Sequence, residues 1–243
     1  MTSSIPTYES IVAKYDLGAV LAGGDLQLTA SGDIAVTPDG DLQFGDDQCN
    51  AMHRLVQRWC FNVRVLETLF ALVMQESQRM QDADEERNNM FGIAFTSGQS
   101  AERFHKLADE IGAGEFGGAV CAGAIMVVLS NMLLRYKEDL KATNPKWERI
   151  GPQFHGYSFG EVVIAAANNF RHHDEWARSQ TLNAQQRKSI SVIEVALNYT
   201  LVSSALVVPW RRNACADLIK VIGGSDFATL ERSFFEFAKA MCA

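Results

Sequence analysis

Apolar residues recur every three or four positions across residues 47–77, and this spacing constrains the fold more than any other feature of the chain. Residues three and four apart share one face of an α-helix. The apolar face comprises Met52, Leu55, Val56, Trp59, Val63, Leu66, Leu69, Phe70 and Val73. Further helical segments are expected at 100–111, 119–141, 158–178, 184–208, 214–222 and 225–240. The sequence therefore predicts a mainly α protein, a bundle of five to seven helices.

Glycine and proline mark the expected ends of these helices. The glycine-rich stretch 112–118 predicts a break before the apolar helix at 119–141, and Pro209 is expected to stop the helix at 184–208. The most apolar stretch, 119–134, is interrupted by Ser130 and Asn131 and is shorter than the roughly 20 residues of a membrane span. We interpret it as a buried core helix and expect no membrane association.

An eight-residue repeat precedes the helical region. Its three copies begin at Gly24, Gly32 and Gly40, and each alternates apolar and polar positions after a turn signal. Such alternation predicts a small antiparallel β-meander near the N-terminus. Its expected buried face consists of Leu26, Leu28, Ile34, Val36, Leu42 and Phe44. The predicted domains are an N-terminal segment with the meander, 1–46, and an α-helical bundle, 47–243.

The overall charge and the cysteines limit the classes of function. The 243 residues carry a net charge of −7 with a pI near 5.3, which argues against a general nucleic-acid scaffold and leaves room for a local basic groove. The five cysteines are scattered, without a Cys-x-x-Cys pair. They indicate free thiols in a reducing, cytoplasmic environment rather than disulfides or a zinc site.

The densest group of chemically capable side chains lies in the segment 158–178. It opens with Ser158-x-x-Glu161, the pattern of a helix-capping box. The candidate functional residues that follow are Asn168, Asn169, Arg171, His172, His173 and Arg178. Residues one turn apart share a face, so Asn168 aligns with His172, and Asn169 aligns with His173.

Four interpretations of this segment are open. It can be a polar helix end that seals the edge of the core. A metal site is disfavoured because the adjacent His172 and His173 diverge by about 100° and no H-E-x-x-H pattern is present, so neither metal nor cofactor is expected. A nucleophile site is disfavoured because the sequence has no G-x-S-x-G elbow. The fourth is metal-independent phosphodiester chemistry, in which a histidine moves the proton and Arg and Asn hold the phosphate.

The run N-N-F-R-H-H in a helical protein resembles the HEPN superfamily, whose motif is an arginine, a polar residue, three variable residues and a histidine. Asn169 matches the polar position and His173 matches the histidine, while Asn168 stands where the family has its arginine and Arg171 supplies a nearby cation. The resemblance covers residues 47–210 by helical pattern. It implies a metal-independent endoribonuclease of a bacterial toxin or anti-phage defence system.

The same resemblance implies the roles of the residues and the partners. His173, Asn169 and Arg171 would be catalytic, and Asn168, His172 and Arg178 would bind substrate. The implied partners are RNA, a second copy in a two-fold homodimer, and a cognate antitoxin or effector.

The alternative is a non-catalytic helical interaction or structural protein. The Gly-Asp repeat is loosely similar to segments of phage tail and baseplate proteins, so a phage-derived structural role belongs to this alternative. The repeat would then offer a strand edge to a partner, and the helix at 158–178 would buttress an interface.

Overall fold

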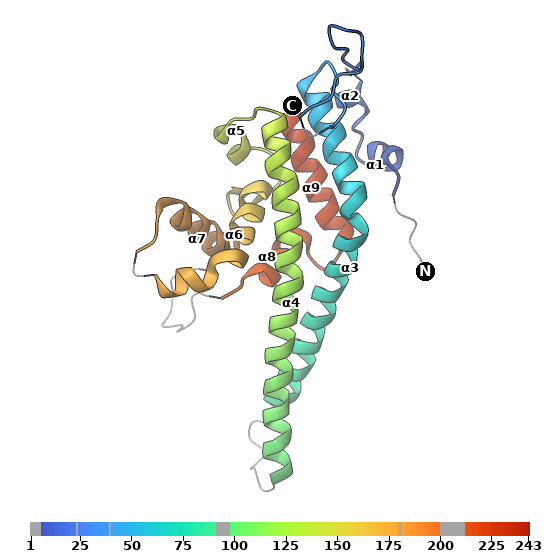
Figure 1. Cartoon of the computed structure of the whole chain (residues 1–243). Helices are drawn as coiled ribbons and strands as arrows, with labels where there is room; N and C mark the ends of the chain where they lie inside the picture. The colour runs from blue at the N-terminus through green and yellow to red at the C-terminus, as the bar shows by residue number, and fades with distance from the viewer. Residues whose placement is uncertain (1–5, 23, 39, 91–97, 180, 200–211) are drawn as a thin grey trace.

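The computed structural model describes residues 6–22, 24–38, 40–90, 98–179, 181–199 and 212–243. It is 74% helical and has nine α-helices in these residues, so the mainly α prediction is confirmed. The helices are α1 (Tyr8–Lys14), α2 (Gly18–Leu21), α3 (Asp47–Asn89), α4 (Gly98–Asp139), α5 (Asn144–Arg149), α6 (Phe159–Arg178), α7 (Ala184–Ala196), α8 (Cys215–Gly223) and α9 (Phe227–Cys242). Helices α3 and α4 form a long hairpin, and the other helices gather around its upper half (Figure 1).

The lower part of this hairpin extends beyond the rest of the molecule (Figure 1). Because α3 has 43 residues at a rise of 1.5 Å per residue, it is about 64 Å long. The predicted break at 112–118 is wrong, since α4 runs through these glycines. A Cβ added to Gly114 would lie 3.2 Å from the carbonyl oxygen of Glu76 on α3. The glycines therefore let the two helices approach closely instead of ending α4.

The core lies where α3, α4, α6, α8 and α9 meet. The predicted apolar face of α3 packs into it, with Trp59 inaccessible to solvent and its ring 4.7 Å from that of Phe234. The Trp59 indole also donates to Glu231, a carboxylate of α9 that pairs with Lys14 of α1. The short N-terminal helix is thereby tied to the bundle.

Helix α4 contains the most apolar window of the chain. By length and composition the segment Ser100–Asp139 is capable of crossing a membrane, but 56% of its apolar window is buried inside the structure. Its inward side chains Ile125, Met126 and Leu129 have no exposed surface. This burial supports the interpretation of α4 as a core helix.

Two arginines of α3 hold the upper end of the hairpin together. Arg54 donates to Asp139 of α4 over 3.0 Å, and Arg58 donates to the other oxygen of the same carboxylate over 3.1 Å. Arg54 is buried and donates further to the carbonyl of Leu42 over 3.3 Å. These two cations therefore clamp α3, α4 and the N-terminal repeat to one another.

The three repeats, residues 24–45, form a closed unit that we call the repeat module. The N–H of Ala35 donates to Gln27 over 2.8 Å, that of Gln43 to Ala35 over 3.0 Å, and that of Gln27 to Gln43 over 2.8 Å. Isolated antiparallel bridges join Leu26 to Phe44, Leu28 to Ile34, and Val36 to Leu42. Each segment thus pairs with both others. The backbone groups of Gln27, Ala35 and Gln43 therefore leave no free strand edge at the centre of the module, contrary to the expectation that the repeat offers such an edge to a partner.

The expected buried face of the module is largely solvent-exposed, so this part of the prediction is wrong. Five of its six apolar residues are between 42% and 64% exposed, and the sixth, Phe44, is half-buried. Instead, Ala35 on the opposite face is buried. Of the residues in the alternate phase, Ala35 is buried while Gln27 is exposed, so the module buries a small residue and leaves the large aliphatic residues in solvent.

A two-stranded β-sheet lies elsewhere in the described residues, between α5 and α6. Strands β1 (Gln153–Phe154) and β2 (Tyr157–Ser158) form a short antiparallel hairpin just before α6. His155 and Gly156 make its turn with φ values of 51° and 92°, as a tight two-residue hairpin requires. Helix α7 ends at Ala196, and the remainder of the predicted helix, with the stop at Pro209, lies mostly outside the described residues.

His53 gives the attachment of the repeat module a pH dependence. Its ring packs 4.7 Å from that of Phe44, and its Nδ1 lies 3.0 Å from the Tyr8 hydroxyl. Burial, with the nearby Arg54 cation, lowers the pKa of His53, while Asp41 opposes the shift. The unfolded chain therefore binds a proton at this position at a higher pH than the folded chain does.

We expect the free energy of unfolding to fall as pH drops below about 6.5, the pKa of an unperturbed histidine. Urea unfolding at pH 8 and at pH 5.5 measures the change. His53→Gln should reduce this dependence, whereas the exposed control His105→Gln should leave it intact. Equal pH profiles for the two variants would contradict the assignment.

Candidate functional site

Helix α6 begins as the sequence predicts. The Ser158 hydroxyl accepts the N–H of Glu161 over 3.2 Å, and the Glu161 carboxylate accepts the N–H of Ser158 over 3.1 Å. The capping box is thus complete. It fixes the start of α6 and hence the direction in which each candidate residue further along the helix points.

Asn169 is fully buried and supports the neighbouring helix. Its side-chain oxygen accepts the backbone N–H of Ala214 over 2.8 Å. Ala214 is the N-cap residue of α8, whose own side chain cannot accept a hydrogen bond. Asn169 therefore supplies a polar partner at the start of α8, and its side chain points into the interior of the protein.

The other two predicted catalytic residues point in different directions. Arg171 is exposed, and its guanidinium lies 3.4 Å from the Asn131 side-chain oxygen on α4. His173 is half-buried, with Nδ1 3.2 Å from the backbone oxygen of Asn169 and Nε2 3.6 Å from the Asp174 carboxylate. Asn169, Arg171 and His173 thus do not converge on one cavity within the described part of a single chain.

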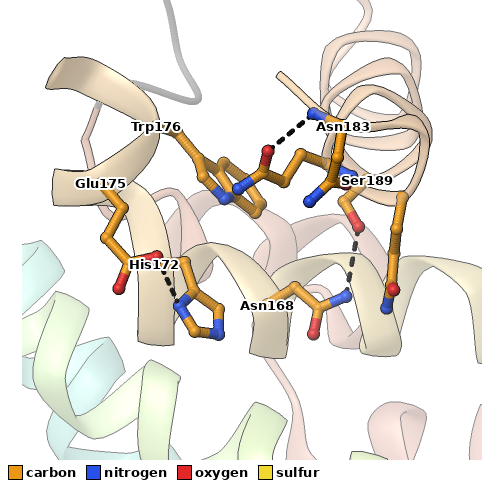
Figure 2. A pocket seen from close by; sticks show the side chains of 8 residues that line it. Asn168, His172, Glu175, Trp176, Asn183 and Ser189 are labelled. Atoms are coloured by element: carbon orange, nitrogen blue, oxygen red, sulfur yellow. Dashed lines mark hydrogen bonds and ion pairs between the residues drawn. The ribbon is translucent and has the colours of Figure 1, made fainter. Parts of the chain in front are cut away.

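Two of the predicted substrate-binding residues do line a cavity, of about 270 Å³, between α6 and α7. Asn168 donates to the Ser189 hydroxyl over 3.2 Å, and His172 Nδ1 lies 3.1 Å from the Glu175 carboxylate (Figure 2). The complete lining is Asn168, His172, Glu175, Trp176, Asn183, Gln185, Gln186 and Ser189. Arg178 is exposed in the last turn of α6 and does not belong to this lining.

The contribution of α7 to this cavity was missing from the sequence prediction. Asn183 and Gln186 form a second capping box, in which each side-chain oxygen accepts the other residue's backbone N–H over 2.9 Å. The spacing Asn-x-x-Gln is visible in the sequence and marks a helix start. It marks the helix start that the sequence already predicted at residue 184, but it does not show which helix α7 packs against.

A second cavity of about 250 Å³ adjoins the first and shares Asn168, Gln185 and Ser189 with it. Lys188 lies on its wall and pairs with Glu148 and, at 3.7 Å, with Glu161. The hydrogen bond to Glu148 raises the pKa of Lys188. The amine therefore stays protonated at neutral pH, and it is suited to ion pairing rather than to proton abstraction.

Neither metal nor cysteine chemistry finds support around α6. No group of three His, Cys, Asp or Glu residues able to hold an ion occurs in the described part of the chain. Cys215 lies against α6, where its thiol donates to the Ala166 carbonyl over 3.3 Å. Burial raises the pKa of this thiol far above neutrality, so it stays protonated and is a poor nucleophile.

Comparison with known proteins adds no assignment. No protein-family model matches the sequence, and no curated protein or solved structure shows significant similarity to it. The function must therefore be argued from the geometry of the chain itself.

Proposed function

We propose that this chain is a non-catalytic interaction protein that docks on a partner protein through the exposed apolar face of its repeat module. The observation that carries the proposal is the outward placement of five large aliphatic side chains. They are Leu26, Leu28, Ile34, Val36 and Leu42. Residues opposite one another in antiparallel pairs have Cβ atoms about 5 Å apart, so Leu28 lies beside Ile34 and Val36 lies beside Leu42 on the exposed side of the module.

The size of this surface favours a specific contact. The exposed area of the five side chains is on the order of 400 Å², in the range where an apolar patch marks an interaction site. The module is also held in place. The Asn50 side chain accepts the N–H of Phe44 over 2.6 Å and donates to the Phe44 carbonyl. Arg54 donates to the Leu42 carbonyl. A pre-formed surface loses little conformational entropy when a partner binds.

Charge indicates the chemistry of the partner. Asp25 and Asp33, the residues just before Leu26 and Ile34, are exposed, and the whole chain carries a net charge of −7. Two copies of so acidic a chain repel one another, which disfavours self-association through this face. We therefore expect a partner protein with an apolar surface bordered by Lys or Arg.

Ile34→Asp should weaken partner binding by about 30-fold, the effect of losing about 2 kcal/mol at a central interface residue. The experiment places a photo-crosslinking amino acid at Leu28 in the native cell. The adduct is identified, and its affinity for the wild-type chain is then measured with purified proteins at low and high salt. We expect a single basic protein, bound more weakly at high salt.

Gln27→Asp is the matched control, because it adds the same charge on the opposite face of the module. It should bind like the wild type, and both variants should keep wild-type stability, since exposed positions tolerate substitution within about 0.5 kcal/mol. Adducts that contain two copies of this chain would contradict the proposal and favour a homodimer. So would equal weakening by Ile34→Asp and Gln27→Asp.

The ribonuclease hypothesis is the second candidate. Arg171 and His172 are exposed consecutive residues of α6, about 100° apart around the helix, and a second copy of the chain facing this helix would be needed to complete a cleft. The exposed apolar residues Phe61, Val65 and Leu72 form a stripe on α3, but α6 packs mainly on α4 and α7, so a dimer through this stripe would not by itself bring two α6 helices together. Against catalysis stands the burial of Asn169, whose side chain is committed to α8.

A further inference from the structure

The cavity between α6 and α7 is rich in hydrogen-bond donors. The capping box of α7 uses the side-chain oxygens of Asn183 and Gln186 as acceptors for backbone N–H groups. Their two NH₂ groups are therefore the parts left to interact with other molecules, and both residues line the cavity. A ligand that fits this site must bring acceptors.

Trp176 supplies an independent observation. This side chain is 2% exposed, and its indole N–H has no acceptor in the structure. Figure 2 shows the ring in the space between α6 and the Asn183 end of α7. A buried donor without a partner costs roughly 1–3 kcal/mol, and an acceptor in the cavity would remove that cost.

The electrostatics of the cavity favour a single negative charge. It lies at the N-terminus of the 13-residue helix α7, where the helix dipole places a partial positive charge. The Glu175 carboxylate lies 3.1 Å from His172 Nδ1, and its side chain is 67% exposed, so solvent screens its repulsion of an anion. The described residues that line the cavity include no Lys or Arg, so the cavity has no such cation to balance the second charge of a phosphate dianion.

We propose that this cavity binds the carboxylate of a small organic acid. The indole of Trp176 and the amides of Asn183 and Gln186 are the donors, and the start of α7 provides the field. A cavity of about 270 Å³ suits a molecule of a few heavy atoms. The site is separate from the docking face of the repeat module, and its occupation does not depend on the docking proposal.

Titration with sodium acetate, followed by the indole N–H resonances of ¹⁵N-labelled protein, tests the proposal. The chain has four tryptophans, and the Trp176 signal is the one that Trp176→Phe removes. We expect acetate to shift this signal saturably downfield at constant ionic strength, whereas sodium chloride leaves it in place. Inorganic phosphate should bind more weakly than acetate.

Gln186→Glu is the decisive variant. A glutamate at this position keeps the oxygen that accepts the Asn183 N–H, so the capping box survives. It removes one donor and adds a negative charge, and we expect acetate binding to weaken by tenfold or more. Gln75→Glu, on an exposed position of α3, controls for net charge and should bind acetate like the wild type.

Three results would overturn the assignment. The first is a Trp176 signal that acetate does not move. The second is unchanged acetate affinity in Gln186→Glu, and the third is tighter binding of phosphate than of acetate. A negative acetate titration would not contradict the docking proposal, because the titration observes the cavity between α6 and α7 and the crosslinking observes the repeat module.

Discussion

Asp139→Ala should lower the free energy of unfolding by about 3 kcal/mol, among the largest effects expected of a single substitution in this chain. Asp139 receives hydrogen bonds from both Arg54 and Arg58, and it is the carboxylate that joins the end of α4 to the start of α3. Its removal leaves the buried Arg54 cation without its main partner. Chemical denaturation monitored by circular dichroism at neutral pH measures the loss.

The matched control is Asp47→Ala. Asp47 pairs with Lys141 over 2.8 Å, but both side chains are largely exposed, and such pairs contribute at most about 1 kcal/mol. The two variants remove the same group from the same end of the hairpin and differ in burial. Equal stability losses would mean that the buried clamp does not hold α3 and α4 together.

The local signals of the sequence predicted most helices. The capping box at Ser158 and the three- and four-residue spacing of α3 describe interactions between near neighbours, and the structure contains both. The glycines at 112–118 misled because a glycine inside a helix also occurs where two helices approach closely. That approach depends on Glu76, far away in sequence, which no local pattern reveals.

The repeat module shows a second limit of sequence patterns. Alternation predicts which residues share a face, but it does not show which of them are buried. Ala35, a small residue on the other side of the segment, is buried instead of the larger aliphatic residues. The large aliphatic residues stay exposed, and this inversion is the observation on which the proposed docking function rests.

The sequence pattern identified a helix that lines a cavity, but not the directions in which its candidate side chains point. Asn168 and His172 line a cavity, as helical spacing suggested for residues on one face. Asn169, one residue further on, turns by about 100° into the core and meets α8. The sequence could not show this, because the partner of Asn169 is a backbone group 45 residues away.

Asn169→Ala should lower the free energy of unfolding by about 2–3 kcal/mol. The substitution leaves the buried Ala214 N–H without its acceptor and opens a small cavity at the start of α8. The neighbouring Asn168→Ala is the matched control. It loses one partly exposed hydrogen bond to Ser189, so we expect a loss of about 1 kcal/mol or less.

A His173→Ala variant, compared with Asn169→Ala, separates a structural role of α6 from catalysis. His173→Ala removes a half-buried ring whose contacts are local, so it should change stability by less than about 1 kcal/mol. Incubation of RNA with wild-type protein in the presence of EDTA should give no cleavage, because Asn169 faces α8 and cannot reach a phosphate beside His173. Cleavage that disappears in a stable His173→Ala variant would refute the interaction-protein proposal and establish the ribonuclease. Loss of stability in Asn169→Ala, without any RNA cleavage by the wild type, assigns this part of α6 to the support of α8.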